Sequence, residues 1–199
     1  VFFLFHRELE PTMKYFESKF AKKSEFIESN KRVLLAGFTY AESVSANATT
    51  FIVDKFPLNK GTYRYLTGNL ATSWGFLAAA EKSGLRLYQG SYPITPATDI
   101  LIELENRRDL GVRAYQAEDE IAGICSAIGA AFAGALAITT TSGPGLSLKS
   151  EALGLAVMTE LPLVVVDVQR GGPSTGLPTK TEQSVLYQAL YGRNGECPV

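Results

Sequence analysis

From residue 68 onward, helix-forming stretches alternate regularly with short apolar runs of strand-like composition, and this alternation constrains the fold most strongly. Strands alternating with helices of this length are joined by right-handed crossovers, which gives a mainly parallel sheet. The sequence therefore predicts an α/β fold with helices on both faces of the sheet. Strands are expected over residues 85–90, 112–117, 135–141 and 161–169, and helices over residues 69–84, 97–111, 118–134, 145–160 and 180–192.

The N-terminal part of the chain has a different pattern. Over residues 8–42, apolar side chains recur every three or four residues among Lys and Glu, which predicts a helical pair or a long broken helix. Residues 43–68 contain small polar residues and a proline, so we expect a connector with a short strand at "TFIV", residues 50–53. The expected organisation is a helical segment (1–45), a linker (46–67) and the sheet domain (68–199).

Charge and hydropathy exclude several classes of partner. The 19 basic and 20 acidic side chains nearly cancel, so no basic excess indicates nucleic acid or an anionic membrane. The apolar runs "VFFLF" and "LPLVVV" are far shorter than the roughly 20 residues of a spanning helix. With no secretory leader recognisable either, we expect a cytoplasmic protein without nucleic-acid or membrane partners.

The counts of histidine and cysteine exclude several chemistries. His6 is the single histidine, so Ser-His-Asp hydrolysis and HExxH zinc chemistry lack their main residue. Cys125 and Cys197 lie far apart and form no CxxC pair, so this chain is not expected to build an iron–sulfur cluster or a zinc site from thiolates. Proton chemistry in this chain would depend on carboxylates or on a cofactor.

Ligands of open parallel sheets bind beyond the carboxyl ends of the strands, which selects four segments. In the first, two prolines enclose Ile94 and Thr95 and fix where the Thr95 hydroxyl points; alternatively, Thr95 caps a helix that begins near Ala97. In the second, Glu118 and Asp119 suit the positive end of a helix dipole.

Glu120 differs from its two acidic neighbours. The turns that follow it, residues 121–128, are almost wholly apolar and are expected to be buried. A carboxylate at the start of a buried helix is desolvated and can share a proton with a ligand nitrogen.

The other two segments are rich in glycine. "TTTSGPGLS" brings backbone close to a neighbour through Gly143 and Gly145 but fails the GxGxxG pattern at Leu148; a tight turn without a ligand is the alternative. "QRGGPSTGLPTKT" approaches a P-loop, but Leu177 stands where the lysine belongs. Arg170 could hold a carboxylate through a two-point fork or be a solvated surface charge.

Taken together, "YPITPATD", "QAEDEIAGICSAIGAAFAG", "TTTSGPGLSL" and "VVVDVQRGGPSTGLPTKTEQ" resemble the alpha subunit of 2-oxoacid:ferredoxin oxidoreductases, in the 2-oxoglutarate (2-oxoglutarate synthase) branch. The similarity runs from about residue 62 to the end, and residues 8–42 are similar to the last part of the gamma-type domain that precedes it in the family. The resemblance implies the pyrimidine-binding domain of a thiamine diphosphate enzyme, incomplete at its C-terminus. We therefore expect the sequence to be part of a longer polypeptide.

The resemblance also implies roles for individual residues. Glu120 matches the glutamate that hydrogen-bonds the aminopyrimidine ring, Thr95 a threonine that lines the substrate site, and Arg170 the arginine that holds the 2-oxoacid carboxylate. These three residues are the expected catalytic group. The expected cofactor-binding residues are Glu120, Tyr92, Pro93, Ile94, Thr95, Ser142, Gly143, Pro144 and Gly145.

The implied reaction is oxidative decarboxylation of 2-oxoglutarate with coenzyme A to succinyl-CoA, carbon dioxide and reduced ferredoxin. Pyruvate or a branched-chain 2-oxoacid is an alternative substrate, and a non-catalytic regulator or a nucleotide-binding module is the alternative of a different class. Thiamine diphosphate is expected to be shared with a beta subunit that carries Mg²⁺ and the iron–sulfur cluster, in a higher oligomer of alpha–beta units. The isolated chain is expected to be inactive.

Overall fold

The computed structural model describes residues 1–44, 49–173, 180, 182 and 185–193. The chain divides into two compact units, Val1–Thr62 and Tyr63–Val199. The boundary between them lies within the stretch expected to be a linker, and each unit is described by itself.

The first unit is built on two helices, α1 (Glu10–Lys19) and α2 (Ser24–Val44), which pack against each other. Lys31 Nζ on α2 lies 2.6 Å from Glu17 Oε1 on α1. No residue of either helix is buried. The helical pair predicted over residues 8–42 is confirmed.

The short strand predicted at residues 50–53 is wrong. These residues have no regular secondary structure, and Phe51 N donates to Leu4 O at 2.7 Å. A strand needs a ladder of hydrogen bonds to a neighbouring strand, and the first unit contains no strand among its described residues. Residues 50–53 therefore have no neighbouring strand to pair with, despite their β-branched and aromatic composition.

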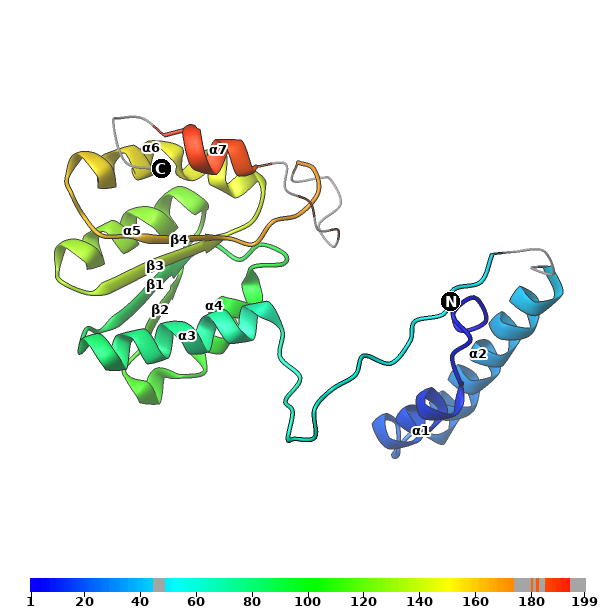
Figure 1. Cartoon of the computed structure of the whole chain (residues 1–199). Coiled ribbons are helices and arrows are strands. Elements are labelled where there is room, and N and C mark those ends of the chain that lie inside the picture. The colour runs from blue at the N-terminus through cyan, green and yellow to red at the C-terminus, as the bar shows by residue number, and fades with distance from the viewer. Residues whose placement is uncertain (45–48, 174–179, 181, 183–184, 194–199) are drawn as a thin grey trace. The chain divides into compact units, whose positions relative to one another are not determined.

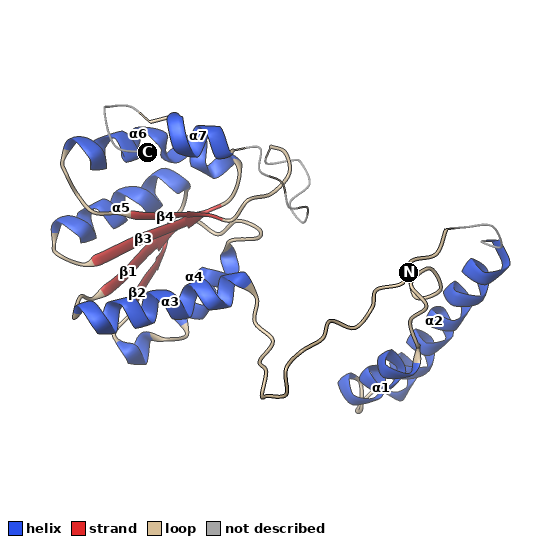
Figure 2. Ribbon diagram, in the orientation of Figure 1, coloured by secondary structure: helices blue, strands red, loops and turns tan. Residues whose placement is uncertain are grey.

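The second unit contains a parallel sheet of four strands in the order β2-β1-β3-β4, drawn in red in Figure 2. This arrangement confirms the predicted α/β fold. The strands are β1 (Leu87–Ser91), β2 (Arg113–Gln116), β3 (Leu136–Thr141) and β4 (Val164–Asp167).

Helices cover both faces of this sheet, as predicted. Figure 1 shows α3 and α4 on one face and α5 and α6 on the other. The helices are α3 (Gly68–Ser83), α4 (Thr98–Glu105), the short 3-10 helix Arg108–Leu110, α5 (Glu120–Phe132), α6 (Pro144–Met158) and α7 (Leu186–Tyr191). Of the residues 180–192 that were predicted to be helical, 181, 183 and 184 lie outside the described part of the chain.

The helix ends follow local chemistry. The Thr67 side chain accepts from Leu70 N at 3.2 Å and caps the start of α3, and Gly84, with φ of +70°, ends it. Asp119 caps α5 by accepting from Ala122 N at 2.7 Å. A carboxylate at this position also faces the positive end of the helix dipole, as the sequence predicts.

Apolar side chains fill both faces of the sheet. One core cluster contains Leu87, Ile100, Leu104, Val112 and Ile138; a second contains Ile124, Ile128, Ala152 and Ala156. Glycines bring α5 close to β1, because a Cβ on Gly90 would clash with Ser126 Oγ. This close approach fixes where α5 begins relative to the end of the sheet.

None of the helices in the described ranges combines the length and the apolar character needed to cross a bilayer.

Candidate functional site

The four segments selected by topology meet at the carboxyl edge of the sheet. Arg170, which follows β4, donates through Nη1 to the Thr95 carbonyl oxygen, which follows β1, at 2.8 Å. Gly143, which follows β3, lies beside Arg170: a Cβ built on it would be 3.4 Å from Arg170 Cγ. Gly145 lies beside Glu120, which follows β2. Contacts therefore join the segments pairwise, although they are far apart in the sequence.

Glu120 is the first residue of α5 and is buried, with a relative exposure of 7%. A Cβ built on Gly145 would lie 3.1 Å from both Glu120 Cγ and Glu120 Oε1, so any larger residue at position 145 would crowd this carboxylate. Within the described part of the chain, no hydrogen bond reaches the Glu120 carboxylate. The carboxylate oxygens are therefore free to form a hydrogen bond with a ligand that reaches this edge of the sheet.

Hydroxyl groups lie around the same glycine. The Thr141 side chain at the end of β3 is fully buried, and a Cβ on Gly145 would clash with its Oγ1. Thr141 Oγ1 and Ser142 Oγ are both buried and have no hydrogen-bond partner among the residues that the structure describes. Unsatisfied buried hydroxyls are uncommon and carry a free-energy cost, so these two are further groups that a ligand could satisfy.

Arg170 is buried, with a relative exposure of 5%, rather than being a solvated surface charge. Its hydrogen bond to the Thr95 carbonyl links the loop after β4 to the loop after β1. Gly143 has φ of +44°, a backbone conformation that favours glycine, and it lies beside the Arg170 side chain. The structure thus brings Thr95, Gly143 and Arg170 together.

The loop after β1 presents Tyr92 and Thr95 to solvent, with Pro93 and Ile94 half-buried between them. The alternative in which Thr95 caps the following helix is wrong. Helix α4 begins at Thr98, its cap position is Ala97, and no side chain caps it; Thr98 N instead donates to Ile94 O at 3.0 Å. The reason is that backbone carbonyls in this turn satisfy the first donors of the helix.

The helix that carries Glu120 is only partly buried, which corrects one expectation. Ile121 is 51% exposed and Cys125 is also exposed, whereas Ile124 and Ile128 are buried. Helix α5 packs on the sheet through one face, so apolar residues on its opposite face stay open to solvent.

Two buried ionisable groups near this edge, Asp167 and Lys149, were not predicted from the sequence. Asp167 ends β4 opposite Thr141, both of its carboxyl oxygens are buried, and burial raises its pKa to about 6. The Gly143 N–H offsets part of this rise in the pKa of Asp167. It does so without a hydrogen bond of good geometry to either carboxyl oxygen. An aspartate directly after the run "LPLVVV" was the available signal for a carboxyl at a strand end.

Lys149 on α6 is the second missed residue and is fully buried, with a relative exposure of 0%. Its Nζ donates to the Glu120 carbonyl oxygen and to Thr139 Oγ1, each at 3.0 Å. The signal in the sequence was a lysine among the apolar and small residues of "GLSLKSEALG".

Part of the glycine-rich segment and one of the two cysteines cannot be placed in this site. Residues 174–179 of the glycine-rich segment, including Leu177, and the cysteine at 197 lie outside the described residues. Among the residues that the structure describes, no group of three or more His, Cys, Asp or Glu side chains is arranged to hold a metal ion.

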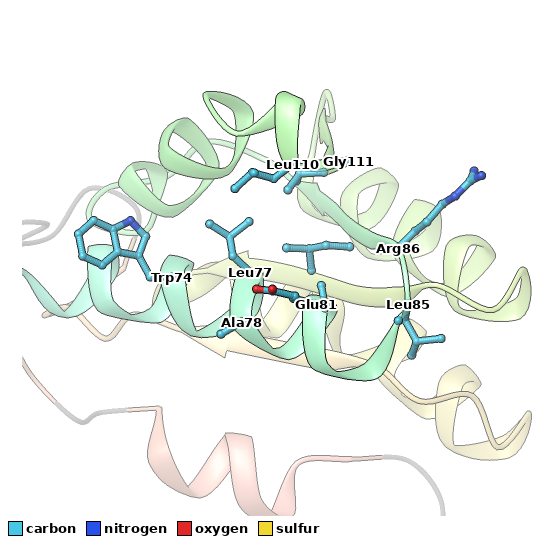
Figure 3. A pocket seen from close by; sticks show the side chains of 12 residues that line it. Trp74, Leu77, Ala78, Glu81, Leu85, Arg86, Leu110 and Gly111 are labelled. Atoms are coloured by element: carbon cyan, nitrogen blue, oxygen red, sulfur yellow. The ribbon is translucent and has the colours of Figure 1, made fainter.

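A cavity of about 580 Å³ lies at the opposite, amino edge of the sheet, where β1 and β2 begin. Figure 3 shows it between the second half of α3 and the turn at Leu110, with Trp74, Leu77 and Glu81 on the α3 side. None of the residues expected to act in catalysis lines this cavity. This cavity therefore lies at the opposite edge of the sheet from the convergent polar groups.

Comparison with known proteins identifies one matching family. Residues 79–199 match the family described as pyruvate flavodoxin/ferredoxin oxidoreductase, thiamine diphosphate-binding. The match contains all four segments at the carboxyl edge.

Individual relatives give the same result. The 2-oxoglutarate oxidoreductase subunit KorA of Mycobacterium tuberculosis is 57% identical over 196 residues, which are 98% of this chain and 30% of the relative. The 2-oxoglutarate synthase subunit KorA of Methanocaldococcus jannaschii is 46% identical over 68% of this chain and 36% of its own length. The chain thus spans about a third of the length of these relatives.

A solved structure is similar as well. It is the 2-oxoglutarate:ferredoxin oxidoreductase from Magnetococcus marinus with 2-oxoglutarate, coenzyme A and succinyl-CoA bound. The TM-score is 0.58 at 38% identity, and the match covers 98% of this chain and 33% of that one.

Proposed function

Since the chain belongs to the pyruvate flavodoxin/ferredoxin oxidoreductase family with a thiamine diphosphate-binding domain, we propose that it is part of the alpha subunit of a 2-oxoglutarate:ferredoxin oxidoreductase. The proposed reaction is oxidative decarboxylation of 2-oxoglutarate with coenzyme A to succinyl-CoA and carbon dioxide, with ferredoxin as electron acceptor. The names of its relatives support this choice of substrate.

The observation that carries the proposal is the state of Glu120. Glu120 is 7% exposed at the start of α5, no hydrogen bond within the described part of the chain reaches its carboxylate, and it lies beside Gly145, where a Cβ would clash with Thr141 Oγ1. A nitrogen heterocycle approaching this edge would supply the missing hydrogen bond. The aminopyrimidine ring of thiamine diphosphate has that chemistry, so the residues present fit the group.

When bound, thiamine diphosphate supplies the carbon nucleophile and the electron sink for loss of carbon dioxide. The contribution of Glu120 is to hold or return a proton at the pyrimidine ring, which is worth about 10²- to 10⁴-fold in rate. Ser142, Gly143, Pro144 and Gly145 would hold the cofactor through a loop whose backbone can come close to it. Tyr92, Pro93 and Ile94 would also contact the bound cofactor.

Arg170 and Thr95 are proposed to orient the substrate. The guanidinium is buried and is held against the Thr95 carbonyl, so its direction is fixed before a 2-oxoacid arrives. A planar fork of N–H donors suits the carboxylate that all 2-oxoacids share. Arg170 would then contribute to binding, and the Thr95 hydroxyl would line the substrate site.

The remaining parts of the enzyme are proposed to lie outside this chain. A beta subunit would complete the thiamine diphosphate site and carry Mg²⁺ and the iron–sulfur cluster, in a higher oligomer of alpha–beta units in the cytoplasm. The chain alone is accordingly expected to be inactive.

The test uses the full-length protein assembled with its partner subunit, with viologen reduction measured on a panel of 2-oxoacids plus coenzyme A. Glu120→Gln should lower kcat by about 10²-fold or more, because the amide cannot exchange a proton with the ring. Glu118→Gln is the matched control: this exposed acid, two residues earlier, should leave kcat unchanged. Arg170→Leu should mainly raise KM.

Two results would count against the proposal. An undiminished kcat in Glu120→Gln would remove the role of that carboxylate. A clear preference for pyruvate or a branched-chain 2-oxoacid over 2-oxoglutarate would replace the substrate and keep the reaction class.

A further inference from the structure

Lys149 occupies a position that stability alone does not explain. Its side chain is fully buried in α6, and burial lowers the pKa of its amine to about 8, because the low-polarity surroundings disfavour the charged form. A methionine or leucine could fill such a space without this desolvation cost. The nearby acidic residues Glu120 and Asp119 offset part of the cost by favouring the charged amine.

The amine joins three elements of the fold. From α6, Lys149 Nζ donates at 3.0 Å to Thr139 Oγ1 on β3 and at 3.0 Å to the main-chain oxygen of Glu120 on α5. Thr139 is itself fully buried in the centre of the sheet. The first turn of α5 is thereby tied to the sheet through one side chain.

Capping of α5 does not require this contact. The start of α5 is already capped by Asp119, which accepts from Ala122 N at 2.7 Å. A positive charge near a helix N-terminus is also unfavourable, because the helix dipole is positive there. The charged amine of Lys149 is therefore electrostatically unfavourable at the N-terminus of α5. Helix capping does not explain why it binds the Glu120 carbonyl.

Helix α6 contacts Glu120 at two points. Lys149 binds its main-chain oxygen, and Gly145, four residues earlier on α6, lies against its side chain, since a Cβ there would be 3.1 Å from Glu120 Oε1. Residues four apart lie on the same helical face. One contact fixes the rotation of the first turn of α5, and the other limits where the carboxylate can lie.

We propose that Lys149 is a positioning residue: through its bonds to Thr139 and to the Glu120 carbonyl, it holds the Glu120 carboxylate in register for proton exchange with the cofactor ring. This inference rests on the proposed function, because it assumes that Glu120 acts on thiamine diphosphate. It assigns Lys149 no contact with cofactor or substrate.

The experiment measures exchange of the C2 proton of bound thiamine diphosphate for deuterium, in the assembled complex of the full-length protein at saturating cofactor. This rate reports the proton transfer without any 2-oxoacid. Lys149→Met, which keeps the length and the apolar stem, should lower the exchange rate by about 10²-fold, the scale of a small misplacement of a reacting group. The cofactor Kd should stay within about twofold of wild type.

Ser150→Ala is the matched control on the same helix. The Ser150 hydroxyl donates to Leu146 O within α6, so its removal should leave exchange at the wild-type rate. Thr139→Val keeps the shape of the side chain but removes one of the two acceptors of the amine, and should slow exchange by about fivefold.

The outcomes separate the inference from the function on which it rests. Wild-type exchange in Glu120→Gln overturns the role of Glu120 itself. If exchange is slow in Glu120→Gln but at the wild-type rate in Lys149→Met, the proposed function stands and the positioning role of Lys149 is overturned. The positioning role is also overturned if weaker cofactor binding entirely explains slow exchange in Lys149→Met. If Lys149→Met does not assemble, Thr139→Val decides, and wild-type exchange in that variant also overturns the inference.

Discussion

Helices α2 and α5 both carry apolar residues at helical spacing, yet the two units use them differently. Helix α2 has 21 residues and buries none of them. Helix α5 has 13 residues and buries six, among them Glu120 and Ile124. The difference is the sheet: α5 packs on β1 and β3, whereas α2 packs on the short helix α1 and on the N-terminal segment, where Phe3 contacts Phe38.

The comparison shows that an amphipathic pattern predicts a helix but not how deeply it is buried. In the first unit, Val33 on α2 is 68% exposed. In the second unit, the sheet brings strand ends and helix starts together, and every residue expected to act in catalysis lies there.

The largest effect is expected from truncating a core side chain. Ile124→Ala removes a fully buried side chain between α5 and α6, so we expect the free energy of unfolding to fall by about 2–5 kcal/mol. Val33→Ala is the matched change in the first unit and should stay within about 0.5 kcal/mol. Urea denaturation of the chain measures both, and equal losses would contradict the contrast.

A smaller effect is expected from the buried carboxyl of Asp167. Its pKa in the fold, about 6, lies above its value in the unfolded chain, so the unfolded state loses its proton first as the pH rises. The neutral form thus stabilises the fold at about pH 4, and this stabilisation is lost as the pH rises through about 6.

Asp167→Asn should remove this pH dependence. At about pH 7 the variant should be more stable than wild type by up to about 3 kcal/mol, and at about pH 4 the two should be similar. Glu25→Gln, on an exposed acid of the first unit, is the control and should not change the pH profile. A wild-type profile in Asp167→Asn would show that Asp167 is not the responsible group.

Glycine substitutions should give effects of opposite sign in the two units. A Cβ at Gly90 would clash with Ser126 Oγ and meet the Gly123 carbonyl oxygen, so Gly90→Ala should destabilise the second unit by about 1–3 kcal/mol. Gly37 in α2 has nothing within 4 Å of such a Cβ, so Gly37→Ala should stabilise its helix by about 0.5–1 kcal/mol. Thermal unfolding followed by circular dichroism shows whether each variant gains or loses stability. A loss of stability in Gly37→Ala would contradict the expectation that a side chain fits at this position of α2.

Much of the fold could be predicted from local patterns. The positions of the strands and the parallel sheet follow from alternation along the chain, and the start of α5 follows from Asp119. The predicted strand at residues 50–53 failed because strand propensity acts only where a neighbouring strand exists.

The candidate site was predicted only in part. Glu120 and Arg170 were found because each follows a predicted strand, but Lys149 and Asp167 were missed. A lysine in a helix is ordinarily solvated, and its apolar and small neighbours in the sequence do not by themselves show that this one is buried. The contact of Arg170 with the Thr95 carbonyl joins residues 75 positions apart, so no local pattern contains it.

The sequence by itself determined the order of strands and helices, the edge at which ligands would bind and the residues that arrive there, because hydrophobic periodicity and turn chemistry are local. Only the tertiary structure decided which of these groups lose their water and which side chains they meet. Burial depends on what packs across the sheet, and that is why the burial of Glu120 and of the Lys149 amine appears only in the folded chain.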